Sequence, residues 1–409
     1  MSPGPDPAGI VGDYLDLGLA LGRHVEGFVD AYYGPPALAR RIEAEPVRSP
    51  ERLVAESRGL LAALDRGDPL DGEVVPADVD DATRRRWIRA QVLGLLTSAR
   101  KLAGEPIGYA EEVAACYGVD PVPVPEDDLA AAHRRLAEAL PGSGELRDRY
   151  IAFRESQAVP PDLLRPALDS LAEDFRERTA TAFGLPDGER IEFELVTDKP
   201  WSGFNTYLGD LHSEVAINTD LPVLSNTLAH LVAHEAYPGH HTEHSRKEAG
   251  LVRRLRRLEE TIFLVGTPQC LLAEGLADLG LEVVAGRRPE ALVAGHLHPL
   301  GIPYEADVLA ELAEAAEGLG AVRGNAAWLL HAEGADPETV VAYLARWSLL
   351  PPARAEKAVE FLLHPTWRAY ISCYVEGLPL VRRFVDGDPA RFARLLTEQL
   401  VPADLEAAA

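Results

Sequence analysis

Cysteine and methionine are scarce in this sequence, and negative charge outweighs positive charge. The 409 residues include three cysteines and one methionine, and 40 basic against 65 acidic residues give a formal net charge of −25. A chain this acidic repels phosphate backbones and anionic lipids, so we expect neither nucleic acid nor a membrane surface as a partner. Cys116, Cys270 and Cys373 are far apart and lack metal-ligand spacing, which is typical of reduced packing thiols in a cytoplasmic protein.

Long apolar runs are missing as well. Residues 1–6 have neither the basic start nor the apolar core of a signal peptide, and no later stretch reaches the length of a membrane span. These absences predict a cytoplasmic location. The hydrophobic share of 47% is still enough for a large core, so the sequence predicts a globular protein.

Apolar residues recur at helical spacing through the first half of the chain, from residue 10 to 184. This pattern predicts about six or seven helices. Glycine and proline cluster at 33–36, 120–125 and 141–144, where we expect the helices to be interrupted.

The period then changes from helical to alternating. Apolar and polar residues alternate over 191–196 and again over 215–218, with glycine turns between them. We expect a small antiparallel sheet of two or three strands here, and a helix that opens near Pro222. The prediction is a mainly α protein with a large helical body, in which residues 1–189 form an N-terminal helical region and 190–409 a second region.

Histidine is concentrated in one short segment of that second region. Five of the twelve histidines fall within it: His230, His234, His240, His241 and His244. Their neighbours are apolar, and buried imidazoles need partners, so a polar helix face explains the cluster poorly. Histidine is the commonest metal ligand, and we therefore expect a metal site, with His230 as a packing or supporting residue.

The spacing in this segment departs from the usual zinc-peptidase helix. That helix carries two histidines four positions apart, with a glutamate directly after the first. Here Glu235 follows His234, but the position four after His234 is Pro238. Pro238 and Gly239 predict a kink or bulge that would bring His240 to the place of the second ligand.

Two other arrangements stay open. In an unbroken helix, His241 would return to the face of His234 about 10.5 Å along the axis, which makes it a second candidate ligand. The same segment also fits an inverted motif, His-x-x-Glu-His, in which Glu243 is the base and His240 and His244 bind the metal. Glu243 and its neighbours could equally form a solvated helix face.

A glutamate in a later apolar stretch is the candidate third ligand. Glu274 lies among leucines, and a buried carboxylate without a cation is costly. Gly275 permits close backbone approach beside it. Asp278, one turn later, could accept the second N–H of a ligating imidazole. In the alternative orientation of this helix both acids are exposed.

Three motifs together resemble a known bacterial family. They are His-Glu-x-x-Pro-Gly-His-His at 234–241, Glu-Gly at 274–275 and Tyr-x-x-Gly at 374–377, with a weaker match at 27–35. The family is called domain of unknown function 885. It resembles zincin metallopeptidases of the gluzincin type, including the carboxypeptidase Taq family, which have a mostly helical fold around a small sheet.

This resemblance implies a zinc hydrolase with one divalent metal ion per chain. For such an enzyme we expect a cleft enclosed by the N-terminal helices, residues 1–189. It implies that His234 and one of His240 or His241 bind zinc, and that Glu274 is the third ligand. Glu235 would be the general base that takes a proton from water and passes it to the leaving amine. Mixed imidazole and carboxylate ligands suit zinc, although cobalt or manganese could replace it.

Other residues are candidates for contact with the substrate. Tyr374 could donate to the tetrahedral intermediate, with Tyr370 one turn earlier on the same side, although tyrosines are more often packing residues. Phe204, Asn205 and Tyr207 lie just before the metal-binding helix, where zincins offer a sheet edge to an extended peptide. A plain surface hairpin is the alternative interpretation.

The sequence leaves three functional hypotheses. The first is a metallopeptidase acting on a peptide or small amide, with the choice between end and internal bonds open because no arginine pair marks a carboxylate clamp. The second is an esterase or amidase with the same machinery and a non-peptide substrate. The third is an inactive helical protein with a structural metal, which would show four protein ligands instead of three.

Overall fold

The computed structural model describes residues 7–71, 81–199, 201–365 and 367–408. Within these ranges the chain is mainly helical, with one small three-stranded sheet and one two-stranded sheet. The predicted fold class is therefore confirmed. None of the described helices combines the length and apolar character needed to cross a bilayer.

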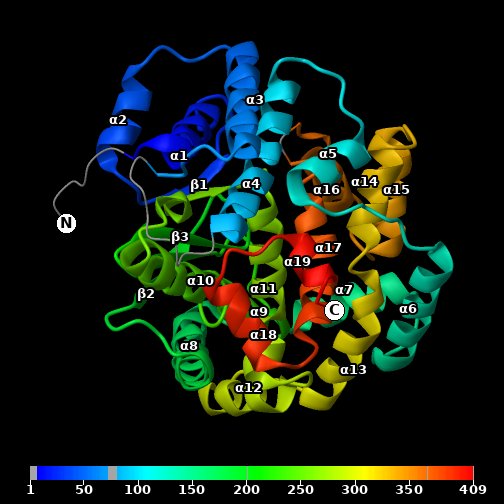
Figure 1. Cartoon of the computed structure of the whole chain (residues 1–409). Coiled ribbons are helices and arrows are strands. Elements are labelled where there is room, and N and C mark those ends of the chain that lie inside the picture. Colours follow the sequence, from blue (N-terminus) through cyan, green and yellow to red (C-terminus); the bar gives the residue numbers. More distant parts are fainter. Residues whose placement is uncertain (1–6, 72–80, 200, 366, 409) are drawn as a thin grey trace.

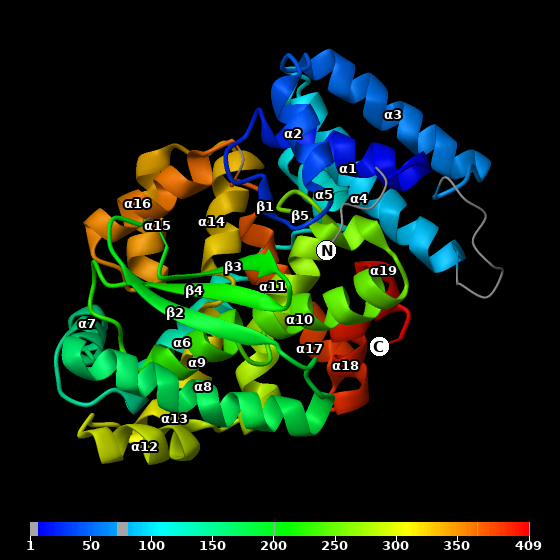
Figure 2. The ribbon, with the colours of Figure 1, turned by 90° about the vertical axis from the view of Figure 1, so that its left-hand side faces the viewer.

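Helices near the N-terminus form a layer at one end of the molecule (Figures 1 and 2). They are α1 (Gly9–Gly22), α2 (Pro36–Ala44), α3 (Pro50–Arg66), α4 (Asp81–Leu102) and α5 (Tyr109–Tyr117). Further along follow α6 (Glu126–Ala139), α7 (Leu146–Ser156) and α8 (Pro161–Phe183). The predicted breaks at 120–125 and 141–144 fall between helices, and the break at 33–36 ends at Pro36, the first residue of α2. The described part of this region holds eight helices instead of six or seven.

A strand inside this region was not predicted. β1 (Val29–Tyr32) pairs antiparallel with β5 (Ile262–Leu264), far along the chain. The pair is irregular because Val29 lies opposite Leu264 and Ala31 opposite Phe263, which makes Asp30 the extra residue of a bulge. This pairing joins the N-terminal layer to the segment that leads into the central helix.

The three-stranded sheet contains β2 (Arg190–Val196), β3 (Gly203–Gly209) and β4 (His212–Asn218), in the order β2-β4-β3. β3 pairs antiparallel with β4, in keeping with the small antiparallel sheet that was predicted. β2 joins the other edge of β4 and runs parallel to it, because the chain crosses over before β3 begins. β3 is therefore an edge strand of this sheet.

Apolar side chains of the sheet pack against α8 and α9 (Ser225–Glu235). Phe193, Val215 and Ile217 from the sheet share one core with Phe175 of α8 and Val232 of α9. Figure 2 shows α8 running along one side of this sheet. The sheet thus provides the surface on which the histidine-bearing helix rests.

The central helix is α11 (Pro268–Ala285), which packs most extensively against α17 (Ile371–Val385) and also against α9. Cys116, Cys270 and Cys373 are buried in the core around it as free thiols, which confirms that they are packing residues. The other C-terminal helices are α12 (Glu290–Leu297), α13 (Ala306–Ala316), α14 (Val322–His331), α15 (Pro337–Trp347), α16 (Pro352–Leu363), α18 (Pro389–Thr397) and α19 (Pro402–Glu406).

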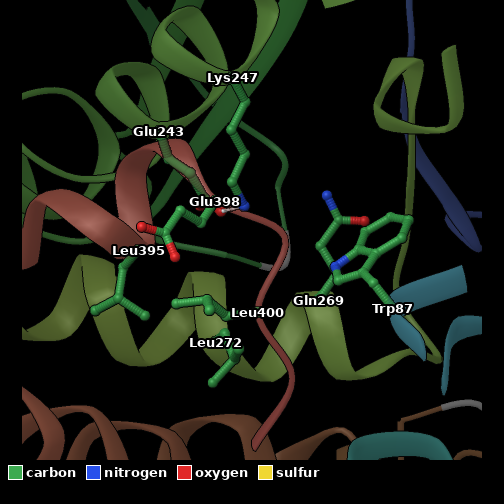
Figure 3. A pocket seen from close by; sticks show the side chains of 8 residues that line it. All are labelled: Trp87, Glu243, Lys247, Gln269, Leu272, Leu395, Glu398 and Leu400. Atoms are coloured by element: carbon green, nitrogen blue, oxygen red, sulfur yellow. Dashed lines mark hydrogen bonds and ion pairs between the residues drawn. The ribbon is translucent and has the colours of Figure 1, made fainter. Parts of the chain in front are cut away.

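Charged groups are buried where α10 (His240–Lys247) meets the helices at both ends of the chain. Lys247 Nζ lies 2.6 Å from Glu243 Oε1, and both side chains are almost fully buried. A cavity of about 10 Å³ adjoins this pair and has room for roughly one water molecule. Figure 3 shows the side chains that line it: Trp87, Glu243, Lys247, Gln269, Leu272, Leu395, Glu398 and Leu400.

Glu260 makes this buried region sensitive to pH. Burial raises its pKa to about 7, which the positive charge of Lys247 opposes and the negative charge of Glu259 reinforces. A raised carboxyl pKa means that the folded state holds the proton more tightly than the unfolded state. The contribution to stability is complete below the unfolded pKa and is lost as the pH rises through about 7.

Glu260→Gln should therefore remove part of the loss of stability between pH 5 and pH 8, because Gln stays neutral at both. Urea unfolding with a chelator present would show wild type losing up to about 3 kcal/mol more than the variant over this interval. Equal losses in the two proteins would contradict the assignment.

Candidate metal centre

A break in the helix carries the histidines into position. α9 ends at Glu235 and α10 begins at His240, so the predicted kink is confirmed as an interruption of four residues. The N–H of Gly239 donates to the carbonyl of Ala233 at 2.9 Å. A Cβ on Gly239 would lie only 1.9 Å from the carbonyl oxygen of His234, so only glycine fits this close approach.

The break brings His240 against His234, and α11 brings Glu274 against both. His234 Nε2 lies 3.1 Å from His240 Nε2 and 3.5 Å from Glu274 Oε2, and His240 Nε2 lies 3.8 Å from Glu274 Oε1. Ligand atoms at about 2.0 to 2.1 Å from a tetrahedral zinc ion lie about 3.4 Å apart. The spacing of this His-His-Glu cluster therefore fits one such ion.

Electrostatics in the cluster also favour metal ligation. Burial lowers the pKa of His240 to about 4, and the charge of His234 adds to this effect, so His240 is neutral as a ligand must be. His234 Nδ1 lies 2.9 Å from Asp278 Oδ1; an N–H donated to this carboxylate leaves Nε2 free to bind a cation. Glu274 Oε2 is buried without a hydrogen-bond partner among the described residues.

Two glycines allow α11 and α17 to bring their side chains together. A Cβ on Gly275 would lie 2.4 Å from the carbonyl oxygen of Gly377, so the helix backbones touch at this point, as the sequence predicted for Gly275. Tyr374 lies on α17 one turn before Gly377, and Tyr370 is the N-cap residue of the same helix. The Tyr370 hydroxyl donates to Glu274 Oε1 at 2.9 Å and thereby orients the carboxylate.

Glu235 lies beside the cluster but does not belong to it. Its side chain is buried, and burial raises its pKa to about 7; the negative charges of Glu274 and Asp278 add to the rise, whereas His234 opposes it. It forms no ion pair among the described residues. Gly203 at the start of β3 leaves room for it, because a Cβ there would lie 3.1 Å from Glu235 Oε1.

His241 does not join the cluster, which corrects its prediction as a ligand. Its Nδ1 lies 2.8 Å from Ser213 Oγ and its Nε2 lies 2.9 Å from Glu189 Oε2. Both ring nitrogens are thus engaged inside the core. The Tyr237 hydroxyl donates to the same Glu189 oxygen, so this set ties the helix break to the sheet and to the loop before it.

The inverted motif is not formed either. Glu243 is paired with Lys247, and the ring of His244 stacks on Tyr207 with centroids 4.9 Å apart. Burial lowers the pKa of His244 to about 3, which keeps it neutral inside the core. His230 is about half exposed and lies 3.4 Å from Asp278 Oδ1, which agrees with its prediction as a supporting residue.

The residues predicted to contact substrate differ in burial and in their contacts. Tyr207 is buried and donates to Glu248 Oε2 at 2.5 Å, so its prediction as a substrate-binding residue is wrong. Asn205 is also buried, and its amide donates to the carbonyl of Glu235 at 2.7 Å, which positions Glu235. Phe204 is partly exposed, and Tyr374 is 39% exposed with its hydroxyl 3.3 Å from that of Tyr370.

Asp30 was missed by sequence reasoning, although it lies in the weakly matching segment at 27–35. Burial raises its pKa to about 7, and the negative charges of Glu274 and Glu235 reinforce the rise. It lies in the bulge of the long-range pair of β1 with β5. No local signal distinguishes it from a surface aspartate.

No family model matches this chain, and no curated protein is significantly similar to it. A solved structure described as a "putative lipoprotein" from Colwellia psychrerythraea has a TM-score of 0.50 and 16% identity, covering 87% of this chain and 68% of that chain. Another, a "putative lipoprotein of unknown function" from Shewanella oneidensis, has a TM-score of 0.44 and 13% identity, covering 90% of this chain and 74% of that one. The first shows that the fold is shared at low identity.

Two substitutions distinguish the roles of the neighbouring residues His240 and His241. His240→Gln removes a cluster atom and should weaken zinc binding by more than about 100-fold. His241→Gln should leave zinc affinity unchanged but lower the free energy of unfolding by about 1 to 3 kcal/mol, because the buried bonds to Ser213 and Glu189 are lost. Competition with a zinc chelator and urea unfolding measure the two effects. The opposite pattern would identify His241 as the ligand.

Asp278→Asn should weaken zinc binding by about 10- to 100-fold, because the carboxylate that orients His234 is replaced by a weaker neutral acceptor. His230→Gln is the matched control, since His230 contacts the same carboxylate from a more exposed position. The same competition experiment should find its affinity close to wild type. A comparable loss in both variants would show that Asp278 acts through general charge and not through His234.

Proposed function

We propose that this protein is a zinc-dependent hydrolase that cleaves peptides. The observation that carries the proposal is the number of ligands: three donor side chains fit one ion, and a buried carboxylate that is not a ligand lies beside them. Structural zinc sites are usually closed by four protein ligands, whereas catalytic sites keep one position for water or substrate. The resemblance to gluzincin peptidases in the histidine motif supports the same assignment.

The residues divide the work between binding and proton transfer. His234, His240 and Glu274 would hold the ion, and a bound zinc ion would supply a Lewis acid that lowers the pKa of water. Glu235 would accept the proton of that water and deliver it to the leaving amine. A general base works best when its pKa lies near the working pH, and the raised pKa of Glu235, about 7, meets this condition.

The surroundings of Glu235 suit an extended peptide. β3 passes directly beside this side chain at Gly203, and it is an edge strand with one side free of strand partners within the described sheet. An extended substrate could add to that edge through main-chain hydrogen bonds. Tyr374, which is partly exposed and whose hydroxyl lies 3.3 Å from that of Tyr370, would donate to the developing oxyanion.

Glu235→Gln tests this proposal most directly. The variant keeps the three ligands, so it should bind zinc as wild type does, while peptide cleavage should fall by about 100- to 10,000-fold through loss of the base. Metal content by mass spectrometry and cleavage of a mixed peptide library give the two readouts. Glu243→Gln is the comparison: it should lower stability through the loss of its pair with Lys247 but retain the cleavage rate of the folded fraction.

If wild type binds zinc and cleaves esters or non-peptide amides but no peptide, the same machinery serves another substrate class. If Glu235→Gln cleaves peptides at the wild-type rate, Glu235 is not the base. Absence of stoichiometric zinc in both proteins would refute the metal centre.

A further inference from the structure

A second group of possible metal ligands shares His234 with the His-His-Glu cluster. Among the described residues, His230, His234 and Asp278 each offer one ligand atom, and these three atoms lie within 4.8 Å of one another. His230 Nε2 lies 3.4 Å from Asp278 Oδ1, and His234 Nδ1 lies 2.9 Å from the same oxygen. We call these three side chains the outer group, because His230 is far more exposed than any member of the cluster.

The spacing of the outer group suits a metal ion. An N–H···O hydrogen bond is usually about 2.9 to 3.0 Å long, so the 3.4 Å between His230 Nε2 and Asp278 Oδ1 is long for one. Two ligand atoms of one tetrahedral zinc ion, however, lie about 3.4 Å apart. His230 and His234 are one turn apart on α9 with ring centroids at 5.7 Å, so both imidazoles can face one ion. Zinc accepts such a mixture of imidazole and carboxylate ligands.

His234 cannot serve both groups at once. A neutral imidazole carries a proton on one ring nitrogen and offers a lone pair on the other. In the His-His-Glu cluster, Nε2 of His234 would bind the ion while Nδ1 donates its N–H to Asp278. In the outer group, Nδ1 would bind the ion and Nε2 would carry the proton. An ion that His234 holds in one group therefore excludes an ion that it holds in the other.

The outer group differs from the cluster in its exposure to solvent. The side chain of His230 is 47% exposed, whereas that of Glu274 is 8% exposed. His234 and His240 are also mostly buried. The outer group therefore offers an ion in solution an exposed ligand, which the cluster lacks.

We propose that the outer group is the entry site of the metal ion: His230, Asp278 and Nδ1 of His234 capture a zinc ion and pass it to the His-His-Glu cluster. During the transfer the ion leaves Nδ1 and binds Nε2 of the same ring. Nε2 gives its proton to water and Nδ1 takes one from water, so the charge of the ring does not change. This inference rests on the metal centre of the proposed function and adds the route by which that centre is filled.

The first test is made at equilibrium in a protein with an incomplete cluster. Competition with a zinc chelator should show that His240→Gln retains one weak site, because its outer group is complete. Adding His230→Gln should weaken this residual binding by about 10- to 100-fold. Adding Asn226→Gln instead should leave it unchanged, because Asn226 is an exposed residue of α9 one turn before His230.

The second test follows the uptake of zinc. Metal-free wild type and His230→Gln are mixed with zinc in a stopped-flow instrument, and a fluorescent zinc indicator gives the readout. His230→Gln should take up zinc about 10-fold more slowly. Release into excess chelator should slow by the same factor, since a site on the path serves entry and exit alike, so the dissociation constant stays that of wild type. Asn226→Gln is again the control and should show the wild-type rates.

Equal uptake rates in wild type and His230→Gln overturn the inference. Residual binding in His240→Gln that does not depend on His230 overturns it too, and so does slower uptake without slower release. In each case the metal centre and the peptidase proposal stand, because neither requires a particular route of loading. If wild type binds no zinc at all, the metal centre fails and the inference fails with it.

Discussion

The contact between Gly239 and the carbonyl of His234 is the constraint on which the candidate site depends. Any side chain at 239 would overlap that oxygen, and without the close approach α10 could not begin where it does. The interruption advances the chain by two residues relative to a helix with ligands four apart. His240 then meets His234, while the next residue, His241, turns into the core and bonds to Glu189 and Ser213.

Close backbone contacts at glycine also position the third candidate ligand, Glu274. Gly275 on α11 touches Gly377 on α17, and Gly280 on α11 lies against Pro238, where a Cβ would approach the ring to 3.1 Å. α11 is thus fixed between the helix break on one side and α17 on the other. Glu274 is buried at the junction with Tyr370 bonded to it. A Cβ at Gly275 would overlap the carbonyl of Gly377, so a larger residue there would push α11 and α17 apart beside Glu274.

The parts of this arrangement that follow from local chemistry were predictable from sequence. Pro238 and Gly239 predict an interruption of the helix that carries the histidines. The leucines around Glu274 predict a buried carboxylate, which needs a cation. Which of His240 and His241 is the second ligand was not predictable. It depends on the hydrogen-bonding contacts of His241 with Ser213 and Glu189, which are distant in the sequence. Tyr207 was misassigned for a related reason: nothing nearby indicates that its hydroxyl reaches Glu248 in the core.

β1 was not predicted because a four-residue strand carries little periodic signal and its partner, β5, lies more than 200 residues further along the chain. Its consequence is electrostatic. Burial raises the pKa of Asp30 in the bulge of β1, and the negative charges of Glu274 and Glu235 add to the rise. A fold that accumulates negative charge without a neighbouring arginine or lysine pair gains most from a cationic ligand. A divalent ion held by His234, His240 and Glu274 would supply that positive charge.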